Sequence, residues 1–262
     1  MFHPLECFER IVVISLERSA ERRERLKKRL RKIGILDRVS FYISPFDGWA
    51  MKPGKDIPLW FFKPATIKSN GHTFKTTFTQ GHWGSLLSHR AVVQAAIEDS
   101  INSILVLEDD VTFCDHFEHR AGEFLDRVPD DWQMVYFRCS LISNLCSFSK
   151  FADGVVRVHN AVSRPMVGYR DTCMEEVVHA WTLATEGVKG PETGDLAQSR
   201  IQDRVVSYCA DPNLAGHESA DTVIGNRTLR RRVATINDYT GWSLGRHGRR
   251  DVEAERGRIF GP

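Results

Sequence analysis

The chain has 262 residues, of which 42% are hydrophobic and 27% charged, and this is the composition of an ordinary globular protein. Its net charge of only +2 at pH 7 indicates no partner by bulk charge, and we expect no nucleic-acid partner. The sequence has no Cys-x-x-Cys pair, no signal-peptide pattern and no apolar run near the ~18 residues of a membrane span, so we expect a cytoplasmic protein with free thiols.

The first predicted unit is a strand, a helix and a second strand. Residues 11–16 are apolar enough for a buried strand, and residues 39–43 form a similar run. Between them, aliphatic side chains repeat at the spacing of one helix face, after a candidate N-cap at Ser19. Arg18 and Arg22 lie near the end of the first strand and the start of the helix, where anions bind in many proteins.

The next stretch, residues 50–80, has little periodicity and contains prolines and an aromatic cluster. A loop that covers a ligand and a structural insertion on the surface both explain this composition. A helix is then predicted over residues 85–98, with Ser85 as its cap. His89 lies one turn later on the same helix face as Ser85, and it has either a structural role or a place in a binding site.

Three consecutive carboxylates follow the apolar run 104–107, which has the composition of a strand buried on both faces. Ionised groups do not stay buried without partners, so we expect Glu108, Asp109 and Asp110 to emerge at the carboxyl edge of the sheet, where open α/β folds bind ligands. Mg²⁺ and Mn²⁺ prefer such oxygen atoms, although an acidic turn explains the pattern equally well. A further strand at residues 132–137 completes an alternation that predicts an α/β fold.

Four sequence blocks together carry a resemblance to a known family. In chain order they are residues 14–22, 47–48, 84–89 and 105–111. In this order and spacing they resemble glycosyltransferase family 25, which includes bacterial lipopolysaccharide galactosyltransferases and collagen galactosyltransferases. Ser85 stands where the family usually has cysteine, a replacement of similar size.

The resemblance implies a GT-A-like nucleotide-sugar-binding domain over residues 1–226, with a mostly parallel central sheet flanked by helices. It also implies inverting transfer of a hexose from a nucleoside diphosphate sugar, expected to be UDP-galactose. The acceptor is expected to be a hydroxyl of a saccharide or glycolipid, as in lipopolysaccharide biosynthesis. Mn²⁺ or Mg²⁺, held by carboxylates, is the expected cofactor because it stabilises a departing diphosphate.

The resemblance also implies roles for individual residues. Glu108 and Asp110 are expected to hold the metal, and Asp195 is the candidate general base, with an ordinary loop residue as the alternative. We expect Asp195 to be exposed, and structural roles are favoured for His217 and Asp221 over a part in the metal site. The residues expected to bind the nucleotide sugar are Leu16, Arg18, Arg22, Asp47, Gly48, Ser88, His89, Glu108 and Asp109.

The C-terminal segment, residues 227–262, is rich in arginine and glycine. A flexible tail, a subunit contact and peripheral contact with the inner face of a membrane all remain open for it. Two alternative functions also remain: a catalytically inactive nucleotide-sugar-binding protein, and another metal-dependent nucleotide enzyme such as a nucleotidyltransferase. The intact carboxylate run argues against the first, and the lack of a glycine-rich phosphate loop argues against the second.

Overall fold

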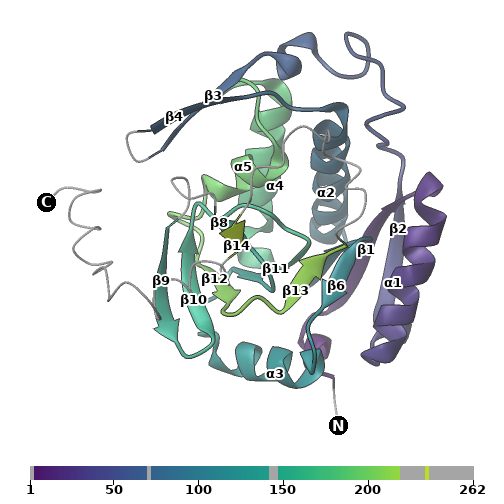
Figure 1. Ribbon diagram of the computed structural model, residues 1–262, viewed down its shortest axis with the longest axis vertical. Helices are drawn as coiled ribbons and strands as arrows, with labels where there is room; N and C mark the ends of the chain where they lie inside the picture. Colours follow the sequence, from purple (N-terminus) through teal and green to yellow (C-terminus); the bar gives the residue numbers. More distant parts are fainter. Residues whose placement is uncertain (1–2, 70–71, 142–146, 219–233, 236–262) are drawn as a thin grey trace, which may run out of the picture.

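The fold is built on one eight-stranded mixed sheet (Figure 1). The structure is a computed structural model that describes residues 3–69, 72–141, 147–218 and 234–235. In spatial order the strands are β2 (Val39–Ser44), β1 (Arg10–Leu16), β5 (Ser103–Glu108), β11 (Met166–Arg170), β7 (Met134–Tyr136), β12 (Ser207–Ala210), β10 (Val155–His159) and β9 (Ser147–Ala152). Only β10 and β11 run against the direction of the others. This arrangement confirms the predicted α/β class with a mostly parallel sheet.

Helices cover both faces of the sheet. They are α1 (Ala20–Lys32), α2 (Gln80–Glu98), α3 (Phe117–Arg127), α4 (Asp171–Glu186) and α5 (Gly194–Ser199). Along β1, alternate side chains enter different cores: Val13 packs with α1 and α3, whereas Val12 packs with α2, α4 and α5. Strands covered on both faces are apolar throughout, and this explains why the apolar runs of β1 and β5 could be identified as buried strands from the sequence.

The predicted strand–helix–strand unit is present. Leu26 and Leu30 form the buried stripe of α1, and Gly34 follows the helix with a φ of +76°, a value that glycine adopts without strain. Strand β1 pairs in parallel with both β2 and β5, and Ile14 lies opposite Glu108. This register brings the ends of β1 and β5 to the same edge of the sheet, beside the start of α1.

Helix α2 begins at Gln80, five residues before the predicted start, so the prediction of Ser85 as its cap was wrong. Thr79 and His82 form a capping box instead. Gly84 lies inside the helix, and the chain that precedes the helix packs directly against it. A Cβ atom on Gly84 would lie 2.5 Å from the Phe46 carbonyl oxygen and 2.6 Å from the Gly48 nitrogen.

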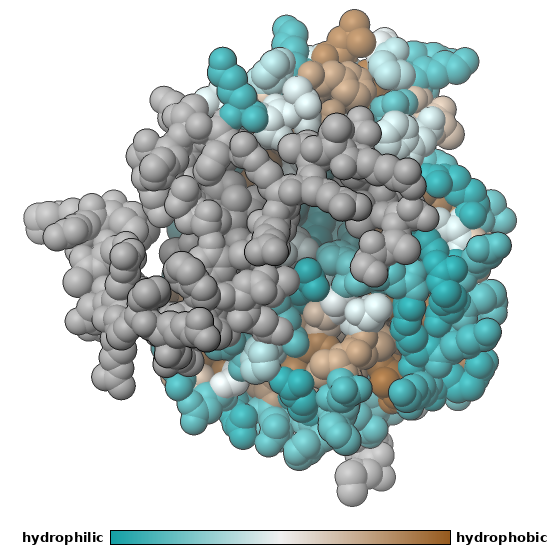
Figure 2. Space-filling model, in the orientation of Figure 1, coloured by the Kyte–Doolittle hydropathy of each residue, from teal (hydrophilic) through white to brown (hydrophobic). Residues whose placement is uncertain are grey.

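Residues 50–80 form an insertion with its own small core. They include a 3₁₀ helix (Leu59–Phe62) and the hairpin of β3 (Ala65–Ser69) and β4 (His72–Thr76). Phe61 is fully buried, and its ring lies 4.9 Å from that of Trp83 on α2. Figure 2 shows apolar surface at the top of the molecule, where Figure 1 places this insertion.

Short strand pairs connect distant parts of the chain. They are β6 (Val111–Phe113) with β13 (Ala215–His217), and β8 (Ser140–Leu141) with β14 (Ala234–Thr235). Apart from β14, the C-terminal segment 227–262 lies outside the described residues, as does Asp221, so the predicted boundary at residue 226 stays a prediction. In the part of the chain that the structure describes, no helix has the length and apolar character that crossing a membrane requires.

Candidate active site

A cavity of about 350 Å³ opens at the edge of the sheet where β1, β2 and β5 end. Because β11 runs the other way, the residues just before it, Ser163 and Arg164, reach the same edge. All but one of the residues predicted to form the site line this cavity: Leu16, Arg22, Asp47, Gly48, Ser88, His89, Glu108, Asp109, Asp110 and Asp195. The exception is Arg18.

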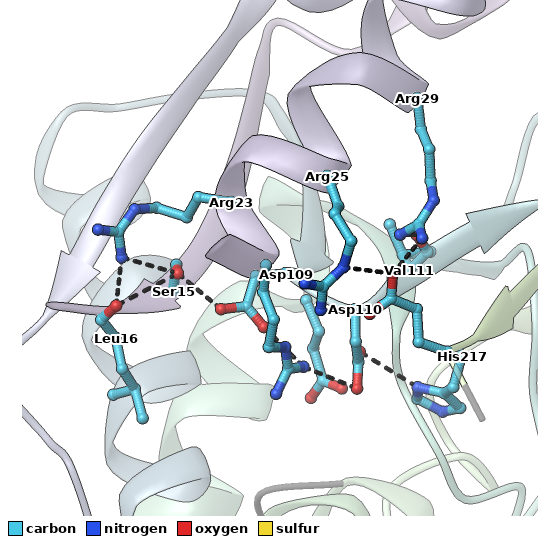
Figure 3. A network of polar contacts seen from close by, with 12 residues as sticks. Ser15, Leu16, Arg23, Arg25, Arg29, Asp109, Asp110, Val111 and His217 are labelled. Carbon is cyan, nitrogen blue, oxygen red and sulfur yellow. Dashed lines mark hydrogen bonds and ion pairs between the residues drawn. The ribbon is translucent and has the colours of Figure 1, made fainter. Parts of the chain in front are cut away.

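Asp109 and Asp110, which follow β5 directly, line the cavity and lie in a polar network (Figure 3). Arg22 from α1 contacts both aspartates, with its Nη2 2.7 Å from Asp109 Oδ1 and 2.8 Å from Asp110 Oδ2. Ser15 donates from its Oγ to Asp109 Oδ2 over 2.6 Å. On the other side, His217 Nδ1 lies 3.3 Å from Asp110 Oδ1. The two neighbouring carboxylates therefore share Arg22 but differ in their second partner, which is Ser15 for Asp109 and His217 for Asp110.

These partners affect the two aspartates in opposite directions. Burial raises the pKa of Asp109 above its usual value, and the contacts with Ser15 and Arg22 offset this only in part. Burial acts on Asp110 too, but the hydrogen bond with His217 and the charges of His217 and Arg22 hold its pKa below the usual value. Asp110 is therefore the more readily ionised of the two.

Three groups converge in a way that can hold a divalent cation. Glu108, Asp110 and His217 each offer one ligand atom, and these three atoms lie within 4.8 Å of one another. Two carboxylates and an imidazole are chemically suited to a divalent metal, and three protein ligands leave coordination positions for a substrate. The structure thus places His217 beside the acidic cluster, although the sequence favoured a structural role for it.

His217 is held in place by its neighbour Glu218. The Glu218 nitrogen donates to the carbonyl oxygen of Asp110 over 2.9 Å, and its carboxylate pairs with Arg25 and Arg29 on α1. The hydrogen bonds from Arg25 and Arg29 lower the pKa of Glu218 to about 2, despite its partial burial. The sequence gave no signal for this clamp, because about 190 residues separate the partners.

Replacing Glu218 with glutamine is expected to weaken metal binding. The amide keeps the size of the side chain but loses the ion pairs that hold His217 against Asp110. Mutations in such supporting residues typically lower metal affinity by about 10–100-fold, and calorimetric titration with Mn²⁺ measures this. Glu176→Gln is the matched control, because Glu176 pairs with Arg204 on the surface. Equal Mn²⁺ affinity in the two variants would show that the clamp does not support the site.

Ser88 and His89 of α2 line the cavity, and their predicted role in binding the nucleotide sugar stays a prediction. Burial lowers the pKa of His89 to about 4, so its ring is neutral at pH 7, and its Nε2 lies 3.1 Å from Glu108 Oε1. A neutral ring in contact with a carboxylate donates through Nε2, which orients Glu108. Ser88 donates to the Gly84 carbonyl over 2.7 Å and contacts Ser44 Oγ at 2.6 Å. The Ser88 hydroxyl therefore links α2 to the end of β2 through its hydrogen bond with Ser44.

Asp195 lies in the first turn of α5, after Thr193 as N-cap. Asp195 was expected to be exposed enough to stay ionised, and the structure shows it only partly exposed, against the residues before β11. Burial alone would raise its pKa, but the charge of Arg164 and the hydrogen bond from Thr193 Oγ1 hold the pKa below its usual value. Asp195 therefore stays ionised at neutral pH through its neighbours and not through exposure to water.

Ser163 connects the two halves of the site. Its backbone nitrogen donates to Asp195 Oδ2 over 3.4 Å, and its Oγ lies 3.3 Å from His217 Nε2. Its φ of +72° is unusual for a residue other than glycine, and such strain is often found at functional sites. Asp110, His217, Ser163 and Asp195 thus form one continuous chain of polar contacts.

Two further arginines lie at or near the cavity. At its rim, half-exposed Arg18 pairs with Asp47, and hydrogen bonding from Arg18 lowers the pKa of Asp47. The nucleotide-binding role predicted for Arg18 stays a prediction. Arg164 also lines the cavity, and the sequence gave no signal for it because a single arginine between a serine and a proline carries no recognisable pattern.

Comparisons with known proteins place this chain in a family. The sequence profile of glycosyltransferase family 25 (LPS biosynthesis protein) matches residues 8–175. Similar proteins include inactive glycosyltransferase 25 family member 3 of Homo sapiens, 28% identical over 138 residues, and procollagen galactosyltransferase 2 of Mus musculus, 26% identical over 132 residues. Each alignment covers 49% of this chain but only 21% and 20%, respectively, of the relative.

A solved structure is also similar, a glycosyltransferase involved in the glycosylation of the major capsid of PBCV-1. It is 12% identical, with a TM-score of 0.42, over 81% of this chain and 93% of that one. The family match includes the acidic cluster after β5 but ends before Asp195 and His217. Because the matched residues make up more than half of the sequence, the chain belongs to glycosyltransferase family 25.

Proposed function

We propose that this protein is a metal-dependent glycosyltransferase that moves a hexose from a nucleoside diphosphate sugar to a hydroxyl of a saccharide or glycolipid. The observation that carries the proposal is the convergence of Glu108, Asp110 and His217 in a cavity that also contains the ionised Asp195. UDP-galactose is the proposed sugar donor, on the strength of the relative named as a galactosyltransferase.

The three converging groups suit a cation that binds a diphosphate. A bound divalent cation would neutralise the charge that develops on the departing diphosphate. The imidazole nitrogen in the set favours Mn²⁺ over Mg²⁺, which prefers oxygen ligands. Arg22 holds Asp109 and Asp110 side by side, and His89 orients Glu108, so the ligands are positioned before any substrate arrives.

Asp195 is the proposed general base. In an inverting transfer, the acceptor oxygen bonds to the anomeric carbon as the bond from that carbon to the diphosphate breaks. The hydroxyl proton passes to a carboxylate oxygen of Asp195, which Ser163 and Thr193 hold in place. Ser163 also contacts His217, so this one residue bridges the proposed base and one of the proposed metal ligands.

A second candidate function is nucleotide-sugar binding without catalysis. It is favoured by the similarity to a family member whose name states that it is inactive. The two functions share the cation site and differ in turnover. The cytoplasmic location, the role in lipopolysaccharide biosynthesis and the peripheral membrane contact of residues 227–262 are proposals that rest on the sequence alone.

A screen of nucleoside diphosphate sugars, with and without Mn²⁺, tests the proposal. Thermal shift reports binding, since a ligand at 100 times its Kd stabilises the folded state by about 2.7 kcal/mol. Release of free sugar reports hydrolysis, the slow reaction expected when water replaces the acceptor. We expect both signals with one class of nucleotide sugar and the loss of both with EDTA. Binding without hydrolysis would support the inactive protein, and no shift with any compound would contradict both functions.

A further inference from the structure

Arg164 is an unusually buried cation with spare hydrogen-bonding capacity. Only 6% of the residue is exposed, and it lines the cavity just before β11. Its Nη2 lies 3.4 Å from Ser85 Oγ, but its Nη1 is buried and has no hydrogen-bond partner among the described residues. Among the residues that the structure describes, no carboxylate lies within ion-pair distance of the Arg164 guanidinium. Such a group is costly to bury unless a ligand completes its contacts.

The guanidinium is fixed in position by its surroundings. It stacks on the ring of Trp181 at 5.0 Å, and Trp181 in turn donates from Nε1 to the Gly194 carbonyl over 2.8 Å. The backbone at Gly194 lies so close that a Cβ atom there would come within 2.3 Å of the Arg164 Nη2. Arg164 is therefore held between α4 and the start of α5, with Nη1 packed close to Gly194 and without a hydrogen-bond partner among the described residues.

The chemistry around Arg164 differs from that of the cation cluster. Its closest charged neighbour on α5 is Asp195, which follows Gly194 directly and also lines the cavity. A guanidinium donor next to a carboxylate acceptor matches the adjacent hydroxyl groups of a pyranose, which both donate and accept hydrogen bonds. The proposed diphosphate would lie instead beside Arg22 and the cluster of Glu108, Asp110 and His217, which line a different part of the polar network.

We propose that Arg164 binds the transferred sugar through its guanidinium and helps to determine which sugar the protein accepts. This assignment rests on the proposed function, because it needs a nucleotide sugar in the cavity. Arg164 is then a specificity-determining residue in the wall of the cavity. The order along the bound molecule is diphosphate at the Glu108–Asp110–His217 cluster and sugar at Arg164, beside Asp195.

Calorimetry with Mn²⁺ tests this order by comparing a nucleoside diphosphate with the corresponding nucleotide sugar. Arg164→Lys keeps the charge but loses the planar group that stacks on Trp181. We expect it to weaken binding of the nucleotide sugar by roughly 10–100-fold, the usual effect of losing a hydrogen bond to a charged group. Affinity for the nucleoside diphosphate should stay within about twofold, since Arg164 contacts only the sugar. Arg170→Lys is the matched control, because Arg170 stacks on Trp132 at the far end of β11.

Gly194→Ala is a second variant that displaces the same guanidinium without removing it, and it should show the same selective loss. Deoxy analogues of the sugar provide a further check, because the analogue that lacks the contacted hydroxyl should bind the wild type and Arg164→Lys equally well. An equal loss for the nucleoside diphosphate would assign Arg164 to the diphosphate and overturn the proposal. Unchanged affinity for both compounds would leave Arg164 a structural residue. Failure of the wild type to bind either compound would overturn the proposed function and this assignment with it.

Discussion

Asp110→Ala is expected to abolish metal-dependent sugar transfer and to leave the protein folded. Asp110 is the carboxylate that its neighbours keep ionised, and it lies with Glu108 and His217 in the proposed cation site. Turnover should fall by at least the roughly 10²–10³-fold that the loss of one charge-stabilising group costs. Metal affinity should fall by more than the roughly 10–100-fold typical of supporting residues. The fold should persist because Arg22 keeps its ion pair with Asp109.

Turnover assays and Mn²⁺ calorimetry in the presence of a nucleoside diphosphate measure these effects, and thermal unfolding checks the fold. Asp153→Ala is the matched control, since Asp153 is exposed and pairs only with Lys150 in the described part of the chain. Metal and nucleotide affinities in Asp110→Ala equal to those of the wild type would contradict the role of Asp110.

The second large effect is expected for Asp195→Asn, which should lower turnover by about 10²–10⁴-fold, the usual contribution of a general base. In the wild type the backbone nitrogens of Ser163 and Leu196 donate to different oxygens of Asp195, and the single amide oxygen of asparagine keeps only one of these hydrogen bonds. The amide also cannot take up the acceptor proton. Binding of the nucleotide sugar should therefore be nearly unchanged, which a comparison of kcat with Kd measures.

The pH dependence follows from the same residue. Because the pKa of Asp195 is held below its usual value, the basic form predominates at neutral pH, and the rate should fall only as the pH drops through that lowered pKa. Asp203→Asn is the control, because Asp203 is exposed and does not line the cavity. Weaker nucleotide-sugar binding in Asp195→Asn would make Asp195 a substrate or metal ligand. An unchanged rate would return it to a structural role.

The sequence predicted the parts of the site that local patterns encode. The apolar runs of β1 and β5 are long enough to identify as buried strands, and charged residues directly after such strands must lie at the edge of the sheet. Arg22 and Asp110 were therefore expected at the same edge, and the structure joins them in an ion pair. The order of the family blocks extended this expectation to Ser88 and His89.

Other parts of the site depend on contacts between residues far apart in the sequence. His217 reaches Asp110 only because β13 pairs with β6, and both strands are too short to show a periodic pattern. The ionisation of Asp195 depends on Arg164, whose position is set by a loop and by Trp181 on α4. No local pattern of sequence specifies such pairings, since each follows from packing of the whole domain.

The start of α2 illustrates a different limit. Gly81 and Gly84 are poor helix formers, and this favoured a helix that begins after them. Their small size is instead needed inside the helix, because the backbone around Phe46 and Gly48 packs directly on Gly84. Tertiary packing has overridden local propensity at this position. The same packing brings Asp47 to the cavity.

The most direct test of the proposed site is a crystal structure with Mn²⁺ and a nucleoside diphosphate, in which anomalous scattering locates the metal. We predict a single strong anomalous peak bonded to Asp110 and to at least one of Glu108 and His217, with diphosphate oxygens completing its coordination. An ordered nucleotide whose metal lies away from Asp110, or a nucleotide bound outside this cavity, would contradict the account.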